Sequence, residues 1–187
     1  SVLRAYIGDR VNRRHRPGRA FERTSYCFDL LSDYGAFRDL QRHRLLTIEW
    51  QELSTEHGYT EPEAISEIGA TEDWKRVMHR TRKLCDFLRR ESSTLAQYAV
   101  PMAYRIRYRM QMNAREAMHV IELRTAPQGH PAYRRVCQHM HRLIAEEAGH
   151  RAIADAMIFA DHSTVELERL GAERETERRK HSYKSFN

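Results

Sequence analysis

The chain has 187 residues, of which 41% are hydrophobic and 31% charged, and its formal net charge is +6. This composition predicts one globular domain with a sizeable core and argues against a disordered chain. No apolar run approaches the roughly 20 residues of a membrane span, no signal peptide opens the sequence, and the three cysteines are far apart. We therefore expect a cytoplasmic protein without disulfides, and the abundance of arginine favours an anionic partner such as a nucleotide or nucleic acid.

The first half of the chain predicts a basic leading segment followed by two strands and a short helix. Residues 1–24 hold seven arginines and two acids and include Pro17 and Gly18, which predicts irregular backbone. Residues 25–31 read as a strand and 33–44 as a short helix. Residues 45–53 read as a second strand that buries Leu46, Ile48 and Trp50 on alternate positions.

The second half predicts longer helices and one further strand. Residues 60–71 read as a loop with a helical turn, 73–90 as an amphipathic helix, and 104–111 as a strand with strict alternation. A helix over 113–124 begins at the N-cap Asn113, and a helix or helix pair fills 132–161, with Gly149 as a possible break. The predicted fold is α+β, mainly an antiparallel sheet packed against long helices, with one domain over 25–162 and a charged helix or tail over 163–187.

Several polar clusters are open to two interpretations. The triplet Arg42-His43-Arg44 is either a solvated helix end or a phosphate clamp. His119 shares a helix face with Arg115 and Glu122, which is either a surface ladder of ion pairs or a polar stripe lining a ligand pocket.

Metal and nucleic-acid binding have weaker support. No HExxH pattern is present, and we expect no metal. Arginines alternate along residues 105–109, but Tyr104 and Tyr108 are expected on the opposite, buried face, which argues against a nucleic-acid stacking surface. Because no glycine-rich phosphate loop is present, any phosphate must be bound by side chains.

Four segments together resemble one known family. "RHRLLTIEWQE" (residues 42–52) is similar to the signature of the flavin-dependent thymidylate synthases, and "AFE" (20–22) resembles their Pro-Phe-Glu element at the same upstream distance. "NAREAMHVIELR" (113–124) is the strongest match, and "AQYAVP" (96–101) resembles the element that precedes it. The resemblance covers roughly residues 17–145 and implies the fold of that family.

The resemblance implies an activity and a set of site residues. These enzymes methylate dUMP with methylenetetrahydrofolate, while FAD carries hydride from NADPH, and they are homotetramers with FAD between subunits and no cysteine nucleophile. Arg124 would be the catalytic residue that stabilises the ionised uracil, with Glu52 and Arg42 also at the substrate. The residues implied at the cofactor are Arg42, His43, Arg44, Asn113, Arg115, His119 and Glu22.

Departures from the family pattern concentrate in its substrate half. Asp39 replaces a glutamine, Trp50 a ligand-contacting glutamate, and Glu52 a serine, while Ser54 and Gln97 stand where the family has phosphate-binding arginines. Losing both arginines would cost several kcal/mol, at about 1.5–3 kcal/mol for each charged hydrogen bond.

Three hypotheses follow from the sequence. The first is an active flavin enzyme in which other arginines, such as Arg19 or Arg105, bind the phosphate. The second is a non-catalytic domain, one half of a longer duplicated protein, that binds flavin or nucleotide and completes an oligomer or a partner's site. The third is a nucleic-acid-binding module.

Overall fold

A computed structural model describes residues 2–164 together with 171, 174 and 178, with side chains from residue 5 onward. It divides into two compact units: Ser1–Tyr26 with Gln111–Asn187 forms the first, and Cys27–Met110 the second. The charged C-terminal helix predicted over 163–187 falls almost entirely outside the described residues, and the predicted domain boundaries stay a prediction.

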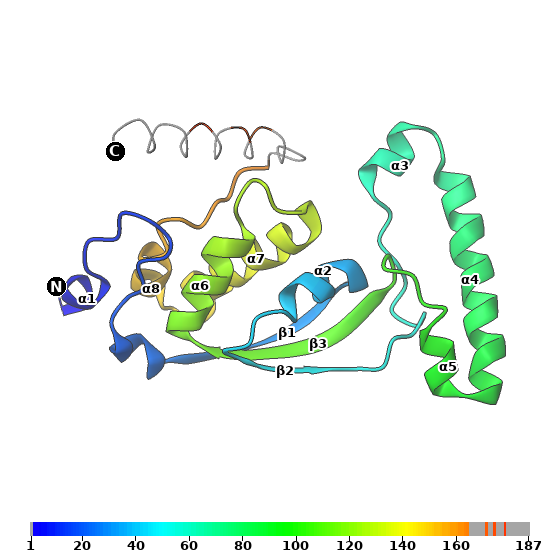
Figure 1. Ribbon diagram of the computed structural model, residues 1–187, viewed down its shortest axis with the longest axis horizontal. Helices are drawn as coiled ribbons and strands as arrows, with labels where there is room; N and C mark the ends of the chain where they lie inside the picture. Colours follow the sequence, from blue (N-terminus) through cyan, green and yellow to red (C-terminus); the bar gives the residue numbers. More distant parts are fainter. Residues whose placement is uncertain (1, 165–170, 172–173, 175–177, 179–187) are drawn as a thin grey trace. The chain divides into compact units, whose positions relative to one another are not determined.

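A three-stranded sheet in the order β1-β3-β2 runs through the second unit (Figure 1). Its strands are β1 (Ser25–Asp33), β2 (Thr47–Trp50) and β3 (Arg105–Asn113). Burial alternates residue by residue along β1 and β3. The bonds Tyr34 N–H to Tyr104 carbonyl, 2.8 Å, and Ala114 N–H to Thr24 carbonyl, 2.7 Å, join the opposite ends of the two strands in antiparallel register. The strands predicted over residues 25–31 and 104–111 are thus confirmed.

Helix α2 (Tyr34–Leu40) is shorter than the helix predicted over 33–44. Asp33 caps it by accepting from the Ala36 N–H at 2.8 Å, and Leu40 is fully buried. One more turn would carry the apolar stripe onto His43 and Arg44. The chain instead leaves the helix after Leu40, so Arg42 lies in the following turn and His43 and Arg44 lie beyond it.

The edge strand β2 departs furthest from the sequence prediction. It spans four residues instead of nine, and Trp50, predicted to be buried, is 56% exposed. Leu46 and Ile48 are half-buried. Strand β2 lies at one edge of the sheet and pairs with β3 alone.

Three helices complete the second unit: α3 (Glu63–Glu67), α4 (Thr71–Glu91) and α5 (Ser93–Gln97). Figure 1 shows α5 lying alongside α4, and the two are in contact. Met78 and Cys85 of α4 form a core with Val100 and Tyr104, and the Tyr104 hydroxyl donates to the Met78 carbonyl at 2.8 Å. The predicted helix over 73–90 and the turn before it are confirmed, although its apolar stripe is not buried throughout.

The first unit is mainly helical. It contains α1 (Val2–Ile7), a 3₁₀ turn η1 (Arg19–Glu22), α6 (Ala114–Arg124), α7 (Pro131–Glu146) and α8 (Arg151–Asp155). Helix α6 packs against η1 and α7, and α7 against α8. Cys137, Met140 and Ile144 on α7 are buried.

Most helix predictions in the first unit are confirmed. Asn113 caps α6 through Oδ1, which accepts from the Glu116 N–H at 2.9 Å. Gly149, at φ +67°, separates α7 from α8. The irregular leading segment was wrong in one respect, because α1 lies within it, and the helix predicted to reach Asp161 ends at Asp155.

The architecture is α+β with a small antiparallel sheet, as predicted. None of the described helices has the length and apolar character needed to cross a bilayer.

Candidate functional site

The start of α6 joins two of the motifs that the sequence singles out. Arg115 donates from Nε to the Pro17 carbonyl at 2.9 Å, and its Nη1 lies 3.4 Å from Oε1 of Glu22. Arg115 and Glu22 are both half-buried. The "AFE" and "NARE" segments, more than ninety residues apart, are therefore neighbours in the first unit.

His119 lies one helical turn beyond Arg115 and lines a cavity. It is half-buried, and the cavity of about 190 Å³ is otherwise lined by Arg13, Arg14 and Arg16. The sequence indicated His119 but not the three arginines. Arg14 and Arg16 belong to a second Arg-His-Arg sequence, Arg14-His15-Arg16, which has no matching context in the family resemblance.

Arg10 anchors the segment that carries these arginines. Its guanidinium forms a buried ion pair with Glu122 of α6, with Nη1 2.7 Å from Oε1. The same side chain donates to the His15 carbonyl at 2.6 Å and the Ala156 carbonyl at 3.0 Å, and it lies over the Phe159 ring. Glu122, for which the sequence left open a surface ladder or a stripe lining a pocket, is thus a buried anchor.

Arg124 is the last residue of α6. It is half-buried, and its guanidinium carbon lies 5.4 Å from the centre of the Tyr133 ring on α7. Such cation–π contact fixes the plane of the guanidinium without neutralising its charge. The Tyr133 ring therefore helps to orient the Arg124 guanidinium.

The second triplet lies in the second unit with Glu52. Arg42 is exposed, with Nη1 3.6 Å from Oδ1 of Asp39, while His43 is buried. Arg44 and Glu52 are exposed. The predicted cofactor set is consequently divided between the units: Glu22, Asn113, Arg115 and His119 lie in the first, and Arg42, His43 and Arg44 in the second.

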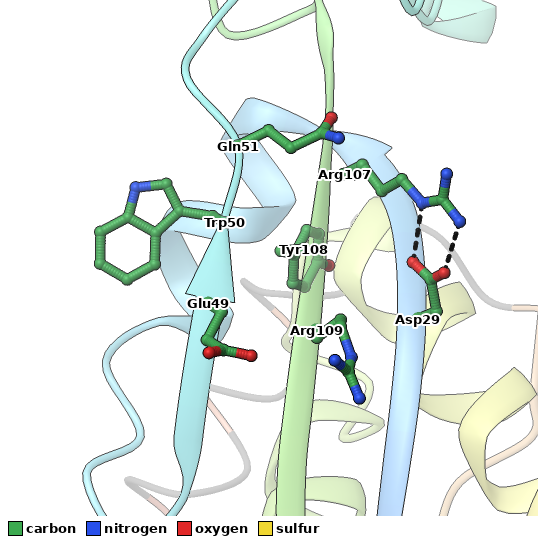
Figure 2. A pocket seen from close by; sticks show the side chains of 7 residues that line it. All are labelled: Asp29, Glu49, Trp50, Gln51, Arg107, Tyr108 and Arg109. Carbon is green, nitrogen blue, oxygen red and sulfur yellow. Dashed lines mark hydrogen bonds and ion pairs between the residues drawn. The ribbon is translucent and has the colours of Figure 1, made fainter.

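A pocket of about 320 Å³ opens on β2 and β3 of the second unit (Figure 2). Arg107 forms a two-point ion pair with Asp29, at 2.6 and 2.9 Å, which lowers the pKa of the Asp29 carboxyl below its usual value. Figure 2 shows the Glu49 carboxylate turned toward Arg109 and the Trp50 indole pointing away from both arginines. The lining residues are Asp29, Glu49, Trp50, Gln51, Arg107, Tyr108 and Arg109.

The two positions where the family resemblance places phosphate-binding arginines have structural roles here. Gln97 accepts the Leu53 N–H through Oε1 at 3.1 Å, and the Ser54 hydroxyl accepts the Glu56 N–H at 3.3 Å. Neither side chain carries a charge. The arginines suggested as replacements also have partners, since Arg19 pairs with Glu22 and Arg105 donates to the Thr60 hydroxyl.

Two of the three cysteines are unsuited to nucleophilic chemistry. Burial raises the pKa of the Cys137 thiol to about 12 and also raises the pKa of Cys85. Cys27 is exposed, and its Sγ lies 3.3 Å from Nη2 of Arg109, a neighbour that the sequence did not reveal.

Comparison with known proteins places this geometry in context. The family model for the thymidylate synthase complementing protein matches residues 4–149. A UPF0159 protein of Chlamydia pneumoniae is 38% identical over 92% of this chain, and one of Thermoplasma acidophilum is 37% identical over 88%. The matches cover 32% and 33% of those proteins, so the chain spans about a third of the length of the curated relatives it matches.

Proposed function

Because the chain belongs to the thymidylate synthase complementing protein family, we propose that it is a flavin-binding domain for FAD-dependent methylation of a pyrimidine nucleotide. The proposed reaction converts dUMP to dTMP, with methylenetetrahydrofolate as carbon donor and NADPH as reductant. Because the relatives are about three times as long, the complete activity is proposed for the chain together with the rest of such a protein.

The observation that carries this proposal is the arrangement at the start of α6. Asn113 caps the helix, Arg115 is fixed by Pro17 and Glu22, and His119 faces a cavity lined by arginines. Helix caps and bonds to backbone carbonyls hold side chains in place before a ligand arrives, which reduces the entropy lost on binding.

The donor set suits a flavin dinucleotide. FAD carries a diphosphate, and the groups gathered here are guanidinium and imidazole donors, which recognise phosphate oxygens by charge and by paired hydrogen bonds. Asn113, Arg115, His119 and Glu22 of the first unit are proposed to hold the cofactor, and Arg42, His43 and Arg44 stay proposed cofactor contacts by family resemblance alone. When bound, FAD supplies the hydride that reduces the transferred carbon to a methyl group.

Arg124 is the proposed catalytic residue. Its guanidinium is half-buried and held over Tyr133, so its direction is set while its charge is retained. A fixed positive charge at the uracil edge stabilises negative charge that develops on the ring during carbon transfer. Glu52 and Arg42 stay proposed substrate contacts by family resemblance alone.

The activity test is dUMP-dependent oxidation of NADPH in the presence of FAD and methylenetetrahydrofolate. Arg124→Ala is expected to lower turnover by about 10²–10³-fold, the usual effect of removing a charge-stabilising donor. Arg151→Gln removes an exposed arginine of the same unit and serves as the matched control. Equal turnover in wild type and Arg124→Ala would contradict the catalytic assignment.

A non-catalytic domain is the second candidate. It is favoured by the uncharged Ser54 and Gln97 at the two phosphate positions and by Trp50 in place of a ligand-contacting glutamate. Such a domain would bind flavin or nucleotide and complete an oligomer, for which we propose a tetramer. Flavin binding without dUMP-dependent turnover, also when the remaining part of the longer protein is supplied, would favour this candidate.

A further inference from the structure

We propose that Arg13, Arg14, Arg16 and His119 form a binding site for the phosphate group of a nucleotide ligand. This inference rests on the proposed function, because it names the residues that bind the phosphate of that function's ligands. The shared chemistry is a phosphate or diphosphate ester. It is carried both by a pyrimidine nucleotide and by FAD.

The cavity has a suitable size and an unusual lining. Its volume of about 190 Å³ equals that of roughly six water molecules at about 30 Å³ each, which is room for a phosphate or diphosphate with part of its hydration. The four lining residues are nitrogen donors or potential donors, and no acid lines the cavity in the part of the chain that the structure describes. A cavity lined in this way selects anions.

The three arginines differ from several other surface arginines of the chain, each of which pairs with a carboxylate. Among the described residues, no acidic side chain pairs with Arg13, Arg14 or Arg16. Ion pairs do form elsewhere on the surface, as the following arginines and acids show: Arg19–Glu22, Arg42–Asp39, Arg76–Asp73, Arg89–Glu56 and Arg107–Asp29. Three like charges around one cavity repel one another, and an anion removes that repulsion.

The backbone between these arginines is held in place. Arg10 donates to the His15 carbonyl at 2.6 Å, and Arg115 donates to the Pro17 carbonyl at 2.9 Å. Asn12 accepts the Arg14 N–H at 2.9 Å through its side chain and the His15 N–H at 3.1 Å through its carbonyl. These hydrogen bonds hold the loop at both ends, and the loop positions the three arginines around the cavity.

Two positions of the second unit lack the arginines that the family resemblance implies. The family resemblance places two phosphate-binding arginines at positions now occupied by Ser54 and Gln97, and both side chains are engaged with backbone N–H groups. Arg14 and Arg16 of the first unit carry guanidinium groups of the kind that those positions lack. We infer that phosphate recognition in this chain relies on the leading segment.

The experiment measures binding of inorganic phosphate and pyrophosphate by isothermal titration calorimetry at low salt. Wild type is expected to bind pyrophosphate more tightly than phosphate, with affinity falling as salt rises. The variant with Arg13→Gln, Arg14→Gln and Arg16→Gln is expected to lose at least tenfold in affinity, because one lost charge-assisted hydrogen bond already corresponds to that factor. Arg151→Gln, an exposed arginine outside the cavity, is the control and should bind as wild type does.

A second set of ligands identifies the source of the phosphate. If the site takes the flavin diphosphate, the triple variant weakens FAD binding and leaves riboflavin binding unchanged. If it takes the nucleotide, the variant weakens dUMP binding and leaves deoxyuridine unchanged. A variant with all three arginines changed to lysine keeps the charge and should retain most of the pyrophosphate affinity, and circular dichroism verifies that both variants are folded.

The proposal is overturned if wild type binds neither anion, or if the triple variant binds pyrophosphate as wild type does. If FAD still binds in that case, the flavin assignment stands and only the arginine site falls. If pyrophosphate binding depends on the arginines while neither FAD nor dUMP binds at all, the site stands and the proposed function falls.

Discussion

Arg10 and Glu122 form an ion pair whose side chains are only 2% and 1% exposed. Arg10 lies a few residues before Arg13, Arg14 and Arg16, which line the cavity, and Glu122 lies in the third turn of α6. The pair therefore connects the leading segment to the helix that carries Arg115 and His119. The pair is satisfied on all sides, because Arg10 also donates to two carbonyls and Glu122 accepts the Phe159 N–H.

Removing one partner of this pair should be severely destabilising. Arg10→Met leaves the Glu122 carboxylate buried without its counter-charge, and we expect the free energy of unfolding to fall by about 3–5 kcal/mol. Urea denaturation measures the change, and Arg23→Ala, an exposed arginine of the same segment, is the control. The double variant Arg10→Met with Glu122→Leu should recover part of the loss. A loss below about 1 kcal/mol in Arg10→Met would show that the pair does not hold the segment.

Gly129 is expected to tolerate no side chain. A Cβ there would lie 2.8 Å from Cε2 of Tyr133 and 3.0 Å from the Ala126 carbonyl oxygen. Gly129→Ala should therefore displace Tyr133, lower stability by roughly 1–3 kcal/mol, and reduce activity because Arg124 loses the ring that orients it. Thermal unfolding and turnover are the measurements, with the exposed neighbour Gln128→Ala as control. Wild-type values in Gly129→Ala would refute the role of this contact.

The Gln97 side chain is predicted to stabilise the fold by accepting a hydrogen bond from the Leu53 N–H. Gln97→Ala leaves the Leu53 N–H without its partner, at a cost of about 0.5–1.5 kcal/mol. Gln97→Glu retains an acceptor oxygen at the same place and should cost less. Equal destabilisation by both substitutions in urea denaturation would argue against the hydrogen bond as the cause.

Two histidines in the first unit predict a dependence of stability on pH. The His141 ring lies 2.9 Å from the Ala154 carbonyl and 2.8 Å from His162, and burial, followed by the charge of His141, lowers the pKa of His162 from its usual value of 6.5. In the window between the lowered pKa and about 6.5, the unfolded chain binds a proton that the folded chain does not. The free energy of unfolding should therefore fall as pH decreases through this window.

Substitution of His162 tests that dependence. His162→Gln should flatten the curve of unfolding free energy against pH between about pH 5 and 7, the range in which an ordinary histidine titrates. His139→Gln, an exposed histidine on α7, should leave the slope unchanged. An identical slope in wild type and His162→Gln would assign the pH dependence to other groups.

The sequence predicted those elements whose signal is local. Strands β1 and β3 alternate strictly between buried and exposed residues. The N-cap of α6 depends only on residues 113–116, because Asn113 accepts a hydrogen bond from the Glu116 N–H. Strand β2 was misjudged because the burial of Trp50 depends on which distant segments cover it in the fold, and no local pattern encodes that. The end of α2 was misjudged because the sequence of residues 42–44 is compatible with a helix, whereas the helix ends at Leu40 in the structure.

The candidate site was only partly predictable. Family resemblance indicated Arg115 and His119. It did not indicate Arg13 and Arg16, which line the same cavity as His119 because hydrogen bonds such as Arg115 to Pro17 join segments about a hundred positions apart. Glu122 looked like one member of a surface ladder because its partner Arg10 is 112 residues away. Tertiary contacts of this range leave no spacing pattern in the sequence.

The central claim, that this domain binds flavin through the start of α6, is tested most directly by titrating the purified protein with FAD and following flavin fluorescence. We predict saturable binding with a dissociation constant below about 10 μM, weakened at least tenfold by Arg115→Ala and unchanged by Arg151→Gln. Absence of saturable binding by folded wild-type protein, or equal affinity in wild type and Arg115→Ala, would contradict the account.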